Sequence, residues 1–281
     1  MSHSFSLPLS EPPDLPAVVE ALGVDDLEAE GELPIAGTWP EGTYLHLYRR
    51  GVSCRSVELG YGADGLQVRV FSCSSADDVV LALALVHELA RRHGVFVRDE
   101  YGDEVPVDQL DAHYAGFPED YARWGAEFLP RMLDGPDVKG PVTLPGPGRP
   151  FVVGPRLIKA LRPSAEGYVA RFYERQRMVR WYDPEGWWFH AEPMLLERED
   201  GVQLRLAALG PGVRYLMPDV NGFALHTDGA PLFIPADQLV QMVDVEWLDE
   251  GQFLLEAIPE GQWGAFLEAA APRCRAIEDF G

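Results

Sequence analysis

The chain has 281 residues, of which 47% are hydrophobic, 11% aromatic and 24% charged. These proportions are typical of a globular protein and exclude collagen-like, coiled-coil and intrinsically disordered chains. Lysine and arginine total 23 against 45 aspartates and glutamates, which gives a formal net charge of −22. Because so acidic a chain repels phosphate backbones and anionic lipids, we expect it to bind neither nucleic acid nor membranes and to favour a basic protein partner.

The cysteine and lysine content predicts a bacterial protein of the cytoplasm. Three cysteines are too few for a disulfide framework, and no CxxC pair occurs. The N-terminus lacks the pattern of a secretory signal, and no apolar run reaches the length that spans a bilayer. Lys139 and Lys159 are the only lysines beside many arginines, a bias associated with GC-rich bacterial genomes.

The first forty residues predict a short strand, a helix and an acidic loop. The strand covers residues 4–9, and the helix covers 14–22 with Asp14 as its N-cap. The stretch 25–32 contains five carboxylates and is expected to be a loop.

Residues 42–99 predict a β-β-β-α-β unit. The three strands are expected at 43–49, 53–59 and 66–71. Pairing Leu59 with Leu66 in a hairpin produces one apolar face and one polar face. The apolar face comprises Val57, Leu59, Leu66, Val68 and Val70.

A helix is expected directly after this hairpin. Ser75 is its predicted N-cap, and Asp78 completes a capping box three residues later. Gly94 is expected to end the helix, and residues 95–97 return as a strand. Residues 106–134 predict two further helical pieces, which Gly116 and Pro118 separate.

Residues 136–150 are rich in glycine and proline and predict a connection between domains. We therefore expect an acidic α+β unit at 1–135 and a second α+β unit at 151–281. Each unit is predicted to contain an antiparallel or mixed sheet covered by helices. The second half shows helical patterns at 155–162 and 166–181, followed by short strands and helices.

The sequence contains no motif that predicts catalysis, a cofactor or a metal. Residues 60–65 match the dinucleotide pattern GxGxxG, but they join two strands where a helix should follow, so a hairpin loop explains them better. The pair His87-Glu88 resembles a zinc-protease motif, yet position 91 is arginine where that motif needs histidine. GxSxG does not occur.

Two acidic runs are the predicted partner-binding residues. Their side chains suit a solvated surface or a surface that recognises a basic protein. They are Asp99, Glu100, Asp103 and Glu104 in the first half, and Asp244, Glu246, Asp249 and Glu250 around the aromatic anchor Trp247 in the second. Reversing the charges of the first group should slow association with little effect on stability.

An arginine cluster spans residues 156–180 and allows two interpretations. Arg171 and Arg175 could bind an anionic ligand, or the cluster could pair internally with the many carboxylates. The aromatic run at 181–189 fits core packing or a pocket wall. An enzymatic alternative would use His190 or Glu192 as a base in a cleft between the halves.

Three stretches of the sequence resemble uncharacterised two-part bacterial proteins related to immunity proteins of polymorphic toxin systems. They are LYRRGVSCRSVEL, ADDVVLALALVHELA and PLFIPADQLVQMVDVEWLDEGQFLLEAIPEGQW. The resemblance implies a non-catalytic intracellular role. Together with the acidity it favours an immunity or accessory protein that neutralises a basic effector or toxin. The alternatives are an enzyme or small-anion-binding protein, and a structural component of a phage-like or secretion assembly.

Overall fold

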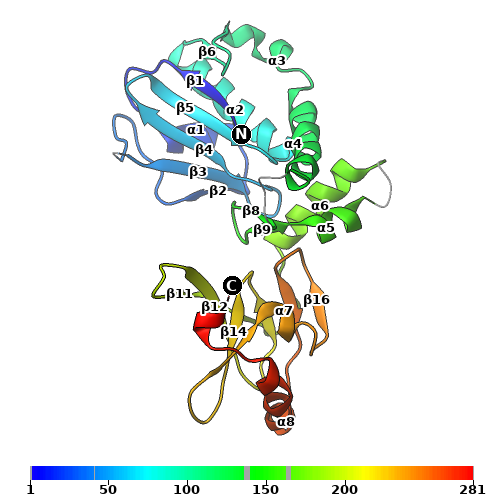
Figure 1. Ribbon diagram of the computed structural model, residues 1–281. Helices are drawn as coiled ribbons and strands as arrows, with labels where there is room; N and C mark the ends of the chain where they lie inside the picture. Colours follow the sequence, from blue (N-terminus) through cyan, green and yellow to red (C-terminus); the bar gives the residue numbers. More distant parts are fainter. Residues whose placement is uncertain (1, 41, 136–139, 163–165, 281) are drawn as a thin grey trace. The chain divides into compact units, whose positions relative to one another are not determined.

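The computed structural model describes residues 2–40, 42–135, 140–162 and 166–280. The chain divides into two compact units (Figure 1). Unit 1 comprises Met1–Phe151 and Ile158–Tyr182, and unit 2 comprises Val152–Leu157 and Asp183–Gly281. The described residues form helices and antiparallel or mixed sheets, which confirms the predicted α+β fold class.

Unit 1 is built on a seven-stranded antiparallel sheet with the order β2-β3-β4-β5-β1-β6-β7. The strands are β1 (Ser2–Leu7), β2 (Leu27–Glu30), β3 (Tyr44–Arg49), β4 (Val57–Gly62), β5 (Gly65–Phe71), β6 (Val97–Arg98) and β7 (Glu104–Val105). Helices α1 (Leu15–Leu22) and α2 (Ala76–His93) lie on one face of this sheet (Figure 1). Alternate strand residues such as Phe5 and Leu47 pack with Leu85 of α2 in the core.

The β4–β5 hairpin has the predicted faces but not the predicted register. All five residues of the expected apolar face are buried. Leu59 lies opposite Val68, however, and not opposite Leu66. The predicted loop is shorter than expected because residues 60–62 extend β4 and only 63–64 form the turn. A shift of two residues preserves the alternation, so the same side chains remain in the core.

The segment 25–32 is not the acidic loop that we expected, because it contains the edge strand β2. Leu27 and Ala29 pack against the core of unit 1. Glu28 alternates with them and binds Arg50 beyond the end of β3 at 2.6 Å. Two of the carboxylates that indicated a loop, Glu28 and Glu30, therefore alternate with apolar residues in a strand, and the others lie outside it.

The N-terminus of α2 is fixed by the predicted capping box. The Ser75 hydroxyl accepts a hydrogen bond from the Asp78 amide at 3.3 Å, and the Asp78 carboxylate accepts the Ser75 amide at 2.8 Å. The same carboxylate accepts the amides of Cys54 at 3.2 Å and Arg55 at 3.0 Å. Burial raises the pKa of Asp78 to about 6, although these hydrogen bonds oppose the rise. Gly94 ends the helix in a left-handed conformation, as predicted.

The rest of unit 1 is largely helical. It contains η1 (Val107–Gln109), α3 (Leu110–His113), α4 (Phe117–Leu133), β8 (Val142–Leu144) and α6 (Tyr168–Arg180). The predicted break before α4 is confirmed, since Gly116 precedes that helix with φ of 79°. Tyr168 and Tyr173 of α6 donate their hydroxyls to backbone carbonyls of α4 at 3.1 and 2.8 Å.

The division into units differs in one respect from the boundary drawn on the sequence. Residues 158–182 belong to unit 1 because α6 packs on α4, whereas the prediction assigned them to the second unit. Of the predicted connection 136–150, residues 136–139 lie outside the described residues. β9 (Phe151–Val153) and α5 (Pro155–Leu161) contain residues of both units.

Unit 2 contains two four-stranded sheets. One has the order β10-β13-β17-β16 and the other β11-β12-β14-β15. The strands are β10 (Phe189–His190), β11 (Met194–Glu197), β12 (Gln203–Leu209), β13 (Tyr215–Met217), β14 (Gly222–Leu225), β15 (Leu232–Pro235), β16 (Val245–Trp247) and β17 (Phe253–Leu255). Further elements are α7 (Ala236–Leu239), α8 (Glu260–Ala270), η2 (Ala271–Arg273) and η3 (Ile277–Asp279). Phe223, Leu239 and Phe253 join the two sheets in one core.

Candidate partner-binding site

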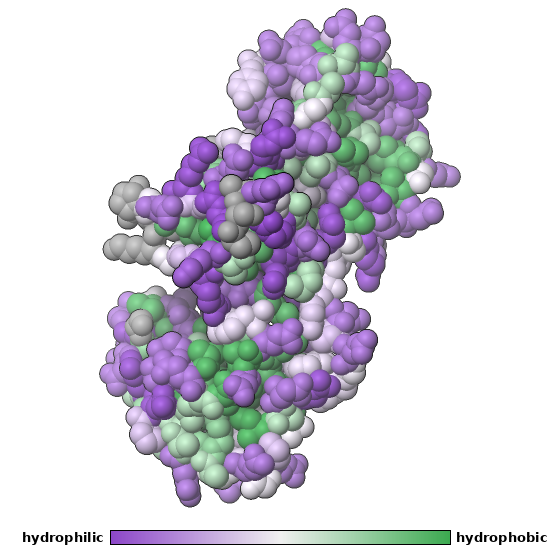
Figure 2. All heavy atoms as spheres, turned by 90° about the vertical axis from the view of Figure 1, so that its right-hand side faces the viewer, coloured by the Kyte–Doolittle hydropathy of each residue, from purple (hydrophilic) through white to green (hydrophobic). Residues whose placement is uncertain are grey.

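An open pocket of about 350 Å³ lies in unit 2. Apolar side chains from β14, α7, β16 and β17 form much of its wall, together with acidic side chains. The lining residues are Arg156, Pro218, Asp219, Val220, Phe223, Ala236, Asp237, Val240, Trp247, Glu250, Gly251 and Phe253. Figure 2 shows unit 2 from the side that carries β16, where apolar surface is bordered by hydrophilic residues. The pocket thus combines an apolar wall with carboxylates.

Trp247 provides the aromatic side of the pocket and holds an arginine of the same unit. The Arg156 guanidinium carbon lies 3.8 Å from the centre of the Trp247 ring, in a cation–π contact. The Phe253 ring meets Trp247 edge-on, with centroids 5.1 Å apart. Arg156 also donates to the backbone carbonyls of Asp249 at 3.2 Å and Glu250 at 2.9 Å. The pocket wall therefore already accommodates one guanidinium.

Two of the predicted acidic residues, Asp249 and Glu250, organise the loop beside this pocket. Asp249 is buried, and its carboxylate accepts the amides of Val152, Gly251 and Gln252 at 2.9, 2.9 and 2.7 Å. Burial raises the pKa of Asp249, and these hydrogen bonds oppose the rise. Glu250 accepts the Leu157 amide at 2.7 Å. Asp249 therefore stabilises the backbone of this loop. Glu250 also binds a backbone amide, and in addition it lines the pocket.

Residues distant in the sequence complete the acidic part of the pocket. Asp219 precedes β14 and lies 3.7 Å from Arg205, and Asp237 is an exposed residue of α7. Neither belongs to an acidic run, so no sequence pattern pointed to them. The predicted residues Asp244 and Glu246 are exposed but do not line the pocket. The structure thus brings together Trp247 and Glu250 of the predicted strip with two carboxylates that sequence reasoning missed.

The acidic run of unit 1 is only partly available to a partner. Asp99 is buried, and its carboxylate accepts the amides of Tyr101 and Asp103, both at 2.9 Å. Glu100 lies 3.3 Å from His3, and Glu104 binds Arg98 of the neighbouring strand at 2.6 Å. The Asp103 side chain is exposed.

The predicted anion-binding arginines are engaged within the chain. Arg171 donates to the carbonyls of Leu161 and Glu166, both at 2.9 Å. Arg175 also takes part in an interaction within the chain. Arg177 donates to the Val52 carbonyl at 2.9 Å and lies 3.0 Å from an aspartate of α2. Of these contacts, that of Arg177 pairs an arginine with a carboxylate, as one alternative expected, while Arg171 is held by backbone carbonyls.

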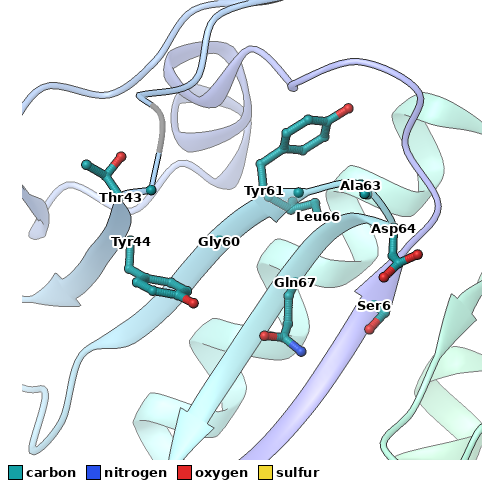
Figure 3. A pocket seen from close by; sticks show the side chains of 12 residues that line it. Ser6, Thr43, Tyr44, Gly60, Tyr61, Ala63, Asp64, Leu66 and Gln67 are labelled. Carbon is teal, nitrogen blue, oxygen red and sulfur yellow. The ribbon is translucent and has the colours of Figure 1, made fainter.

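A second hollow, of about 310 Å³, lies at the β4–β5 turn of unit 1 (Figure 3). The Tyr44 ring lies over Gly60, where an added Cβ would come within 2.8 Å of the ring. Gln67 and Asp64 contribute an amide and a carboxylate to the same hollow. Its twelve lining residues include no arginine or lysine, so the chemistry does not suit a phosphate. The GxGxxG match is a hairpin, as predicted.

Further candidate reactive groups are two cysteines and the proposed bases His190 and Glu192. Burial raises the pKa values of the Cys54 and Cys73 thiols to about 12, so both stay protonated at neutral pH. His190 lies in β10 and Glu192 follows it, and neither lines the unit 2 pocket. The described residues include no group of three side chains suited to hold a metal ion. No helix among them is long and apolar enough to cross a bilayer.

Comparison with known proteins gives one match. A protein-family model described as domain of unknown function DUF4299 matches residues 22–183, which is more than half of the chain. The match covers most of unit 1 and ends one residue beyond it. No curated protein and no solved structure matches the chain.

Proposed function

This chain belongs to the DUF4299 family, and we propose that it binds a basic partner protein through its acidic surface. The observation that carries the proposal is the lining of the unit 2 pocket, where, among the described residues, the carboxylates of Asp219, Asp237 and Glu250 outnumber the one cation, Arg156, beside an aromatic wall. Carboxylates attract an arginine or lysine side chain, and aromatic rings pack against its alkyl stem and charge. The pocket is thus suited to a cationic side chain of the partner.

The distribution of charge supports the same proposal. Backbone carbonyls of the chain already bind Arg171, Arg177 and Arg156. The net charge of −22 follows from the excess of carboxylates over lysine and arginine. The negative electrostatic field of such a chain speeds the association of a basic protein and slows that of an acidic one.

The test uses a blocked twelve-residue peptide with six arginines, and a matched peptide in which citrulline replaces each arginine. We expect the arginine peptide to bind the full chain, as measured by fluorescence anisotropy, and the citrulline peptide to bind far more weakly. Asp219→Asn and Asp237→Asn should each weaken binding by about three- to tenfold, because each removes one charge from the pocket. The control is Asp228→Asn, an exposed aspartate of the same unit outside the pocket. Equal binding of both peptides would contradict the proposal.

The cellular role that we propose is that of an immunity or accessory protein for a basic effector in a bacterial cytoplasm. Support comes from the acidity and from the sequence resemblance described above. The product of the neighbouring gene is the partner to examine first. We expect its expression to arrest growth and co-expression of this chain to restore growth, with weaker rescue by the double variant Asp219→Asn, Asp237→Asn. A neighbouring metabolic enzyme without affinity for this chain would contradict the role.

A further inference from the structure

Strand β11 is an exposed apolar edge strand in unit 2. It lies at the end of its sheet and pairs only with β12 in the described structure. Met194, Leu195 and Leu196 are 48%, 67% and 37% exposed. Edge strands of stable proteins are usually protected by lysine, proline or a bulge within the strand, since a bare edge pairs with other chains. Met194–Glu197 contains no lysine, proline or bulge, and Glu197 is its one charged residue.

In the described structure no strand pairs with the outward backbone groups of this edge. The Arg198 amide donates to the Val202 carbonyl at 2.9 Å, so the Leu196–Leu204 pair two residues on is also hydrogen-bonded. Leu195 and Glu197, on either side of Leu196, therefore direct their amides and carbonyls away from β12. The hydrogen bonds of Arg205, which lies opposite Leu195 in β12, support this orientation. The backbone of Arg205 is hydrogen-bonded to Asn221, on the side of β12 that faces away from β11.

The charges around β11 indicate what pairs with it. Exposed carboxylates lie before, within and after the strand, at Glu192, Glu197 and Glu199. Arg198, the one cation of this stretch, is held by Asp200 at 2.5 Å. A second copy of the chain would bring another net charge of −22 and the same carboxylates to the edge. A basic strand meets complementary charge instead.

We propose that β11 receives an extended basic segment of the partner protein as an added strand, an inference that rests on the proposed binding of a basic partner. The backbone of Leu195 and Glu197 would pair with the segment. Apolar side chains of the segment would cover Met194 and Leu196, and its alternating arginines or lysines would lie on the opposite face beside Glu197. Main-chain pairing gives such additions affinity, while alternate side chains give them specificity.

The experiment separates main-chain pairing from charge attraction. The probe is a blocked peptide in which valine alternates with lysine or arginine, and its control carries N-methyl groups on alternate amides with unchanged charge. Leu195→Pro removes the outward amide of β11 together with the leucine side chain and fixes φ, whereas Leu195→Ala trims the side chain and keeps that amide. We expect binding of the probe to weaken about tenfold or more for Leu195→Pro and for the N-methylated peptide, and only a few-fold for Leu195→Ala. The amides of Leu195 and Glu197 should gain protection from hydrogen exchange.

Each result has a distinct meaning. If neither Leu195→Pro nor N-methylation changes the affinity for the basic peptide, while Asp219→Asn still lowers it, strand addition is overturned and the proposed function stays intact. Failure of every basic peptide to bind the wild-type chain would overturn both. A dimer of the free chain that Leu195→Pro dissolves on size-exclusion chromatography would assign the edge to a second copy and overturn the proposal. If Leu195→Pro does not fold, the N-methylated peptide decides alone.

Discussion

At the scale of single residues, the fully buried carboxylate of Asp78 joins several backbone segments of unit 1. It accepts backbone amides from Cys54, Arg55 and Ser75. Asp78→Ala would leave these donors unpaired, and we expect the free energy of unfolding to fall by roughly 2–5 kcal/mol, as for a lost cap with buried unsatisfied amides. Urea unfolding measures the effect. The neighbouring control Asp77→Ala should cost less than about 1 kcal/mol, because that residue makes only a partly exposed ion pair.

The same residue predicts a dependence of stability on pH. Burial raises the pKa of Asp78 from an ordinary value near 3.8 to about 6. Between these values the folded chain binds more protons than the unfolded chain, so the contribution of Asp78 to stability falls as the pH rises. We therefore expect wild-type stability, measured relative to Asp78→Asn, to decline from pH about 4 to about 6 and then to level off. Urea unfolding at several pH values tests this. A difference that rises over this interval would show that hydrogen bonding to the carboxylate outweighs its burial.

At the scale of elements, Arg180 at the end of α6 holds the glycine- and proline-rich segment that follows β8. Its guanidinium donates to the carbonyls of Leu144, Pro145 and Arg149 at 2.9, 3.1 and 2.7 Å and is almost fully buried. We expect Arg180→Ala to make the segment 144–150 a site of rapid cleavage by proteinase K, with stability lower by about 3 kcal/mol or more because buried carbonyls lose charged donors. Arg131→Ala, at an exposed arginine of α4, is the control. Equal cleavage of the two variants would show that Arg180 does not hold the segment.

Local patterns predicted many elements, because helix and strand periodicity depends on neighbouring residues. The cap of α2 and the buried face of the β4–β5 hairpin followed from side-chain types at fixed spacing. The failures came from composition. The carboxylates of 25–32 concealed the alternation of Leu27 and Ala29 in β2, and three glycines made residues 60–65 look like a loop. An acidic composition indicates that side chains face solvent, but it does not distinguish a loop from an edge strand, whose charged side chains also face solvent.

At the scale of the whole molecule, the candidate pocket could be predicted only in part. Trp247 and Glu250 stand in one acidic strip and were identified from it. Asp219 and Asp237 reach the same pocket from the loop before β14 and from α7, and a single sequence contains no signal for contacts between such distant positions. The burial of Asp249 was equally unpredictable. A carboxylate that accepts three backbone amides looks identical in sequence to one that faces solvent.

The burial of Asp99 also changes which charge reversals test electrostatic attraction. Reversing Asp99 would place an arginine where a carboxylate accepts two backbone amides, so reversal of the whole first acidic group should destabilise unit 1 and obscure any effect on association. The informative pairs are exposed: Asp103→Arg with Asp108→Arg in unit 1, and Asp244→Arg with Glu246→Arg in unit 2.

Each pair makes the net charge less negative by the same amount, so any difference between the pairs reports position. We expect both to slow association of the arginine peptide at low salt in stopped-flow measurements, the unit 2 pair by several-fold more, because Asp244 directly precedes the pocket strand β16 and Glu246 lies within it. Above about 0.5 M salt the rates should converge with those of the wild type, since the Debye length then falls below about 5 Å. Equal slowing by both pairs would mean that the field of the whole molecule governs the encounter, and no slowing by either would reduce the acidic surface to a solubilising role.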